Sequence, residues 1–197
     1  MEEPPQELVP TSRFETLTDG VYTVALTLLV TTLGLPAGEL SDAQFQKELE
    51  AQIPKIGVWL LSFWLILGNW LNFVRTSKFI AKQNRLLLHI GVTQIVFITL
   101  LPFSTSLVGE HWQHPMSVII YTANLWVISA TAACRVRLIK RTSSSDQNNS
   151  GLIHQSRASY ILLLGTTISL ALSGILPGWN LLAFVIAKLW PVSQKKP

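Results

Sequence analysis

The sequence is poor in charge, cysteine and histidine. Only 13% of its 197 residues are charged, whereas soluble domains carry about 25%. The single cysteine, Cys134, excludes an internal disulfide framework, and four scattered histidines offer no metal cluster. The apolar segments contain no paired carboxylates, no nucleophile beside a base and no metal-ligand spacing, so we do not expect an enzyme.

Long apolar runs are abundant instead: 49% of the residues are hydrophobic, and the mean hydropathy is +0.38. A helix that spans a bilayer needs about 20 apolar residues, and its backbone must be hydrogen-bonded internally. Five runs meet this length and a sixth is shorter: Phe14–Leu35, Ile56–Val74, Leu86–Val108, Met116–Cys134, Ala158–Ile175 and Trp179–Trp190. We therefore predict an all-α integral membrane protein with six transmembrane helices per subunit. The last run is short, so a re-entrant or tilted final helix is the alternative.

The segments outside these runs are short. We expect one six-helix membrane domain over residues 13–192, with tails at 1–12 and 193–197. The leader carries Glu2, Glu3 and Glu7 but no Lys or Arg, unlike a cleaved signal, so the first helix is expected to remain in the mature protein. Ser41-Asp42-Ala43-Gln44 reads as a capping box that opens a short helix ending before Pro54.

Basic residues favour one side of the predicted membrane. With six spans, both termini and thirteen Lys or Arg residues share that side, against only Lys47 and Lys55 opposite. By the positive-inside rule we predict cytoplasmic termini. The net charge of +4 then follows from topology and requires no nucleic-acid partner.

The first run differs from the others in its pattern. At about 100° per residue, Gly20, Val24, Thr27 and Thr31 form a narrow stripe that Leu28 flanks, while Asp19 lies about 115° away. Thr and Gly are common where membrane helices pack closely. On spacing alone, packing is therefore a more common role for this stripe than lining a pore.

A resemblance to a known family changes this balance. Arg13 followed by Leu17-Thr18-Asp19 resembles the Arg-x-x-x-Phe-Ser-Asp signature of the transmembrane-protein-175 family of potassium channels. Family-like features also occur downstream, in Trp70, in Leu101-Pro102-Phe103-Ser104-Thr105 and in Tyr121-Thr122-Ala123-Asn124-Leu125. The similarity covers residues 13 to about 130. Leu17 and Thr18 depart from the Phe and Ser of the signature but keep an apolar side chain and a hydroxyl.

The resemblance implies a potassium channel of a prokaryotic plasma membrane. Such members assemble as homotetramers with four first helices around the pore, and the matching constriction residues are Val24, Thr27, Leu28 and Thr31. Rings of Val and Leu exclude water, while Thr oxygens partly replace the hydration shell of a monovalent cation. Modest potassium selectivity is the expectation, with transient potassium at Thr27 and Thr31 and no other metal or cofactor.

The charged start of the first run is assigned to structure. An ionisable group in a membrane segment is costly and needs a partner. For Thr18 and Asp19 the candidate partners are Asn69, Trp70 and His89, and Arg13 is expected to join the same network.

Two other classes stay open. A proton-coupled or secondary cation transporter tends to place charges or broken helices at the membrane midplane. Apart from Pro102 the predicted spans are continuous and uncharged at their centres, which favours a passive pore. A membrane protein whose threonine stripe only packs is the third possibility.

Overall fold

The protein is a bundle of long helices. The computed structural model describes residues 10–34, 38, 40–80, 84–142 and 149–174, and within these ranges it contains helices and no strands. The elements are α1 (Thr11–Leu28), the 3-10 turn η1 (Leu29–Thr32), α2 (Asp42–Ala51), α3 (Ile53–Ser77), α4 (Arg85–Thr99), α5 (Leu101–Glu110), α6 (Pro115–Thr142) and α7 (Asn149–Leu172). The all-α class predicted from the apolar runs is confirmed.

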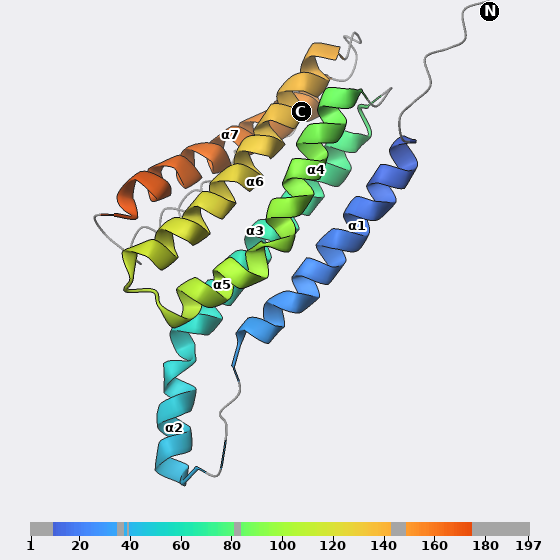
Figure 1. The fold of residues 1–197 in the computed structure, drawn as a ribbon. Helices are drawn as coiled ribbons and strands as arrows, with labels where there is room; N and C mark the ends of the chain where they lie inside the picture. The colour runs from blue at the N-terminus through green and yellow to red at the C-terminus, as the bar shows by residue number, and fades with distance from the viewer. Residues whose placement is uncertain (1–9, 35–37, 39, 81–83, 143–148, 175–197) are drawn as a thin grey trace, which may run out of the picture.

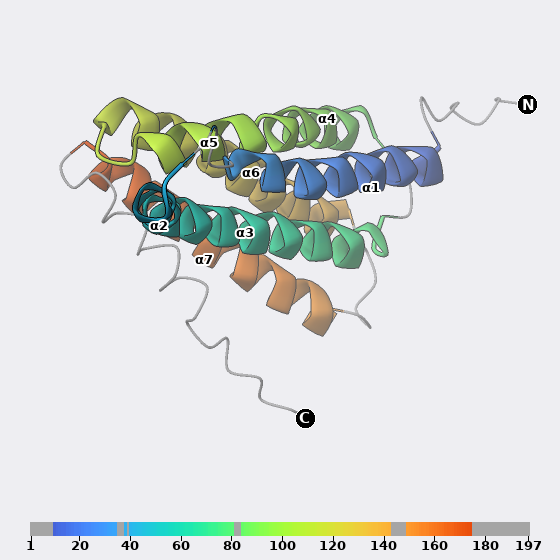
Figure 2. The same cartoon turned by 90° about the horizontal axis from the view of Figure 1, so that it is seen from below.

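Along the chain, the direction through the bundle alternates: α1, then α3, then α4 continued by α5, then α6, then α7 (Figure 1). α1 lies at one edge beside α3 and α4, and α6 lies between α4 and α7. Figure 2 shows α1 and α3 side by side along most of their lengths. α1 begins and α3 ends at the same end of the bundle, which we call the basic end because four basic residues lie there: Arg13, Arg75, Lys78 and Arg85.

Three stretches of the described chain are long and apolar enough to cross a membrane: Asp42–Ser77, Arg85–Glu110 and Pro115–Arg141. α1 is not among them; its 18 residues include Arg13, Glu15 and Asp19. The predicted sixth span lies outside the described residues. The count of six therefore stays a prediction.

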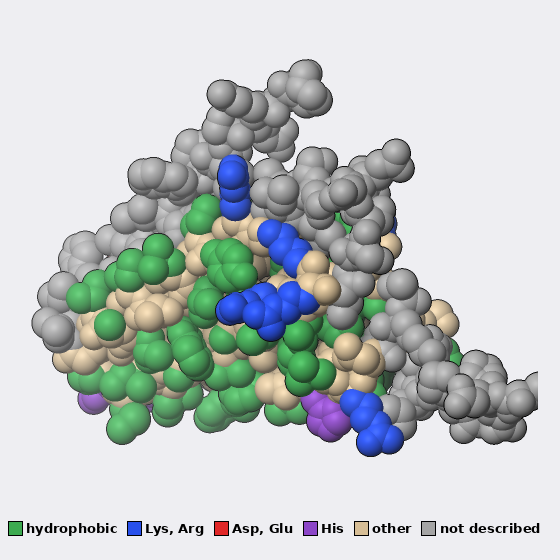
Figure 3. Space-filling view, turned by 90° about the horizontal axis from the view of Figure 1, so that it is seen from above, with side chains coloured by type: hydrophobic (Ala, Val, Ile, Leu, Met, Phe, Trp, Pro, Cys, Tyr) green, Lys and Arg blue, Asp and Glu red, His purple; other side chains and the backbone are tan. Residues whose placement is uncertain are grey.

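The surface of the bundle suits a bilayer. Large apolar side chains are widely exposed, with Trp64 57% and Phe103 60% accessible. On the face in Figure 3, hydrophobic side chains predominate, basic side chains lie in its centre and right-hand part, and no acidic side chain is visible. Buried polar residues are frequent in the interior. This distribution, apolar outside and partly polar inside, is what a hydrocarbon solvent favours.

The predicted end of the first span is wrong. α1 ends at Leu28 and not at Leu35; the β-branched run Val30-Thr31-Thr32 follows, and the Thr31 and Thr32 hydroxyls bond carbonyls three residues earlier. Such bonds compete with regular helix geometry and tighten it to a 3-10 turn. The third span, predicted over Leu86–Val108, agrees with the apolar stretch Arg85–Glu110. It is interrupted at Leu100 because Pro102 has no amide hydrogen to continue the α4 ladder.

The predicted break from Arg135 to Arg157 is also too long. α6 continues to Thr142 and α7 already begins at Asn149. Arg135 lies inside the bundle, where its guanidinium donates to Ser77 Oγ (2.7 Å) and Thr76 Oγ1 (3.2 Å) and lies 3.8 Å from the centre of the Phe73 ring. A charged side chain was expected to end the helix; its hydrogen-bond partners on α3 allow it to remain within one.

The capping box at Ser41 is confirmed. The Ser41 backbone amide donates to Gln44 Oε1 at 3.0 Å, and α2 ends at Ala51, before Pro54. None of the α2 residues is buried, and the helix extends beyond the end of the bundle opposite the basic end (Figure 1).

Candidate pore-lining face

The predicted lining residues lie together on the exposed side of α1. Gly20, Val24, Thr27, Leu28 and Thr31 are all exposed in the single chain, and we call this set the lining face. Val24 is 56% accessible and Leu28 46%. The opposite side of α1 is buried through Phe14, Thr18, Tyr22 and Ala25. The helical spacing therefore separates one side that packs within the subunit from one whose partners lie outside it.

The threonine hydroxyls of this face donate their hydrogens to backbone carbonyls of the same helix. Thr27 Oγ1 donates to the Val24 carbonyl (2.8 Å), and Thr31 Oγ1 donates to the Leu28 carbonyl (2.7 Å). A hydroxyl has one hydrogen to donate and two acceptor lone pairs. Because the hydrogen is already used, each oxygen presents only acceptor capacity outward, which suits a cation.

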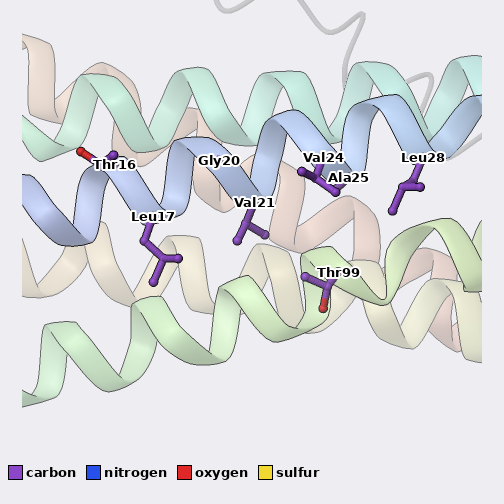
Figure 4. A pocket seen from close by; sticks show the side chains of 8 residues that line it. All are labelled: Thr16, Leu17, Gly20, Val21, Val24, Ala25, Leu28 and Thr99. Atoms are coloured by element: carbon purple, nitrogen blue, oxygen red, sulfur yellow. The ribbon is translucent and has the colours of Figure 1, made fainter.

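An apolar groove of about 420 Å³ borders the lining face. In Figure 4, Leu17 and Val21 point from α1 toward α4, and Thr99 lies on the α4 side of the groove. Gly20, Val24 and Leu28 also line it. Leu17 is 58% accessible, so within the single subunit it makes no buried apolar contact. Phe14, on the buried side of α1, packs on α4, where its ring would clash with a Cβ on Gly91.

Asp19 is held by Trp70. The indole Nε1 donates to Asp19 Oδ1 at 2.9 Å, which joins α1 to α3. Thr18 is buried, and its hydroxyl donates to the Phe14 carbonyl of its own helix (2.7 Å). Asp19 therefore lies beside the lining face and is anchored within the subunit.

The other candidate partners of Asp19 are engaged elsewhere. Asn69 Oδ1 accepts hydrogen bonds from the Tyr22 hydroxyl and from Gln94 Nε2, both at 2.6 Å. His89 is exposed, and its Nδ1 lies 2.6 Å from the Arg85 carbonyl. Arg13 is exposed and has no side-chain bond to another described residue. The expected contacts of Asn69, His89 and Arg13 with Asp19 are therefore absent from the described structure.

Sequence reasoning missed Tyr22 and Gln94. Both are almost fully buried, and together with Asn69 they connect α1, α3 and α4. The available signal was polarity: Gln94 lies within an apolar run, where a polar side chain requires a partner. Tyr22 lies on the side of α1 opposite the lining face, so its hydroxyl could have been expected to point into the bundle.

Comparison with known proteins gives consistent matches. Residues 13–102 match the family described as endosomal/lysosomal potassium channel TMEM175. A potassium channel of Chamaesiphon minutus is 27% identical over 138 residues, which are 70% of this chain and 68% of that one. A potassium channel of a Chryseobacterium species is 22% identical over 185 residues, 93% of this chain and 94% of the relative.

The fold is also found in a solved structure. The crystal structure of a lysosomal potassium-selective channel TMEM175 homolog from Chamaesiphon minutus superposes with a TM-score of 0.78 at 22% identity, covering 90% of this chain and 94% of the other. The helical bundle and its apolar surface thus fit a membrane protein with the fold of this solved structure. Over residues 13–102 the chain is similar to the TMEM175 family, and the relatives reported above are bacterial proteins. The matched family and these relatives are described as potassium channels, which agrees with the expectation of a channel and not an enzyme.

Proposed function

We propose that this protein conducts potassium passively through a pore that four copies build from their α1 helices. The observation that carries the proposal is the lining face itself. It combines apolar Val24 and Leu28 with Thr27 and Thr31, and it is exposed along its whole length in a chain whose other polar side chains are often buried. The match of residues 13–102 to the TMEM175 family and relatives that bear the name potassium channel support the same function.

Each lining residue contributes a ring of four in such a tetramer. The Val24 and Leu28 rings exclude water and close the pore by dewetting when it narrows. The Thr27 and Thr31 rings offer hydroxyl oxygens whose hydrogens are already bonded within the helix, so they replace part of the hydration shell of an entering cation. Potassium sheds water at lower cost than sodium, which gives a preference of modest size.

Asp19 and Trp70 have a supporting role in this mechanism. Their hydrogen bond fixes the side of α1 that is turned toward α3. The lining face is then turned away from the bundle and toward the proposed axis. The termini are proposed to lie in the cytoplasm, with the basic end at the inner surface of a prokaryotic plasma membrane, in agreement with the distribution of Lys and Arg.

The test is the reversal potential of purified protein in a planar bilayer between unequal potassium and sodium solutions. The wild type is expected to give currents that reverse near the potassium potential. Thr27→Val removes the hydroxyl with little change of shape and should reduce the preference for potassium.

Thr93→Val is the matched control. Thr93 is also exposed and bonds a carbonyl four residues earlier, but it lies on α4, outside the lining face. If Thr93→Val alters selectivity as much as Thr27→Val does, the assignment of α1 as the lining helix is wrong. Proton-coupled cation uptake without passive current would favour a transporter. If neither uptake nor current is observed, the lining face has a packing role only.

A further inference from the structure

A second cavity lies away from the lining face, between α3, α6 and α7. Its volume is about 160 Å³. The residues that matter here are Leu71, Asn72, Arg75, Gln155, Ser159 and Leu162. None of them belongs to α1, so the cavity is separate from the proposed pore.

The polar groups of this cavity have unused hydrogen-bonding capacity. The Gln155 side chain is 9% accessible and makes no hydrogen bond to another described residue. Asn72 donates from Nδ2 to Ser159 Oγ at 3.0 Å, but its buried Oδ1 has no partner in the described part of the chain. Buried polar groups are normally hydrogen-bonded, so the unpartnered Asn72 Oδ1, together with the unused Gln155 amide on the α7 side of the cavity, points to a bound ligand.

The charge in the cavity comes from Arg75, in the last turn of α3. No carboxylate lines the cavity. An exposed guanidinium with donors in a fork suits a phosphate, which it binds through two parallel hydrogen bonds. Gln155 adds a neutral donor, while Asn72 Oδ1 requires a donor from the ligand. The ligand thus needs an anionic phosphate and a hydroxyl group.

The order of residues along the bundle indicates which kind of ligand fits the cavity and how it is oriented. Arg75 lies two residues from the end of α3, at the basic end, and Asn72 with its partner Ser159 lies one turn deeper. Leu71 and Leu162 add apolar surface at and below this depth. A membrane lipid presents its headgroup at the end of a transmembrane helix and its acyl chains further in. The polar and apolar parts of the cavity follow the same order.

From this arrangement we infer that the cavity between α3, α6 and α7 binds the headgroup of an anionic, hydroxyl-bearing phospholipid of the phosphatidylglycerol type. Arg75 binds the phosphate, Gln155 donates to a phosphate oxygen, and a headgroup hydroxyl donates to Asn72 Oδ1. The start of one acyl chain packs on Leu71. Phosphatidylcholine offers a phosphate but no hydrogen-bond donor in its headgroup, so it leaves Asn72 Oδ1 unpaired. The inference does not depend on conduction.

Native mass spectrometry of the intact protein released from detergent tests this inference. Equal amounts of phosphatidylglycerol and phosphatidylcholine are added to the delipidated wild type. Phosphatidylglycerol is expected to occupy a site at roughly tenfold lower concentration, because it alone supplies a hydrogen bond to the buried Asn72 Oδ1. Equal occupancy by the two lipids would overturn the inference without any variant. Free glycerol phosphate provides a second arm. If it displaces phosphatidylglycerol at equal concentration, the cavity binds a soluble phosphate and the lipid assignment is wrong.

Variants locate the site. Arg75→Gln and Gln155→Leu should each weaken phosphatidylglycerol binding by roughly fivefold to tenfold. Arg137→Gln is the matched control because Arg137 is exposed on α6 toward the same end and does not line the cavity. If Arg137→Gln weakens binding as much as Arg75→Gln, the lipid is attracted by the general basic charge of this end and not by the cavity. The elution profile of each variant in gel filtration in detergent shows whether that variant is folded. If a variant is misfolded, the comparison of the two lipids on the wild type still tests the inference.

Discussion

The two sides of α1 differ in whether their side chains reach another helix of the subunit. On the buried side, Tyr22 donates its hydroxyl to Asn69 of α3, and the Phe14 ring lies against Gly91 of α4. On the lining face, Thr27 and Thr31 bond only carbonyls of their own helix. One side is thus fixed by contacts between helices, whereas the other is satisfied locally and remains free to meet another molecule. The difference explains how one helix can be anchored firmly and still present oxygen atoms to an ion.

Asp19 lies between these two sides. It is exposed, yet Trp70 holds its carboxylate. A carboxylate that faced the proposed axis would attract cations strongly but slow their release. Its position beside the lining face removes this charge from the path and uses it to attach α1 to α3. The comparison of the two sides therefore predicts that changes on the buried side alter assembly, while changes on the lining face alter conduction.

The largest effect is expected where Phe14 of α1 packs on Gly91 of α4. Gly91→Val places side-chain atoms where the Phe14 ring lies. Overpacking of this kind costs about 1–3 kcal/mol, and we expect the upper part of this range because backbone and a rigid ring are involved. The unfolding midpoint in SDS should fall. Gly20→Ala is the control: Gly20 is on the lining face, and a Cβ there has no atom within 4 Å. A loss for Gly20→Ala as large as for Gly91→Val would contradict the division of α1 into two sides.

The second effect concerns the link between α1 and α3. Asp19→Ala removes the acceptor of the Trp70 indole and should cost about 1–3 kcal/mol. We expect less assembled protein in gel filtration, with an unchanged reversal potential in the fraction that assembles. Asp19→Asn keeps an acceptor oxygen and should recover most of the assembly. A tetramer of Asp19→Ala that forms normally but loses its preference for potassium would place Asp19 in the ion path.

The sequence alone predicts the class of the fold and the direction of the lining face. Apolar runs of about 20 residues indicate membrane helices, and helical spacing places Val24, Thr27 and Thr31 on one exposed side. Both signals are local, since they depend only on the order of residues in one segment. The end of α1 at Leu28 is harder to predict from the sequence, because it depends on hydroxyl–carbonyl bonds that compete with the helix over a few residues.

The partners of the polar side chains could not be predicted in the same way. Asn69, Trp70 and His89 all lie near the predicted depth of Asp19, but only the rotation of α3 and α4 decides which of them reaches it. Trp70 does, Asn69 turns to Tyr22, and His89 remains on the surface. Arg135 shows the same limit. Its charge suggested a break in the helix, and only the packing of α6 on α3 supplies the hydroxyls that satisfy it.

A smaller loss of stability is expected for the bond between Tyr22 and Asn69. Tyr22→Phe removes one hydroxyl from the buried side and should cost about 1 kcal/mol. Gln94 still donates to Asn69 Oδ1, so the acceptor is not left without a partner. The midpoint of SDS unfolding should fall slightly, and the reversal potential should not move. Tyr160→Phe, on the exposed surface of α7, provides the matched control. Equal losses in the two variants would show that the Tyr22 bond contributes nothing specific.

The smallest effect on stability and a large effect on current are expected at Val24. This side chain is exposed in the single chain, so Val24→Ala should change the unfolding midpoint by less than about 0.5 kcal/mol. In the proposed tetramer, however, four valines form one water-excluding ring, and removing their methyl groups widens it. Single-channel current should therefore rise while the unfolding curve remains unchanged. Val92→Ala, at an exposed position on α4, tests whether any exposed valine has the same effect. If both variants leave the current as it is, the apolar ring is not where the pore is narrowest, and α1 has to be rotated about its axis relative to the arrangement proposed here.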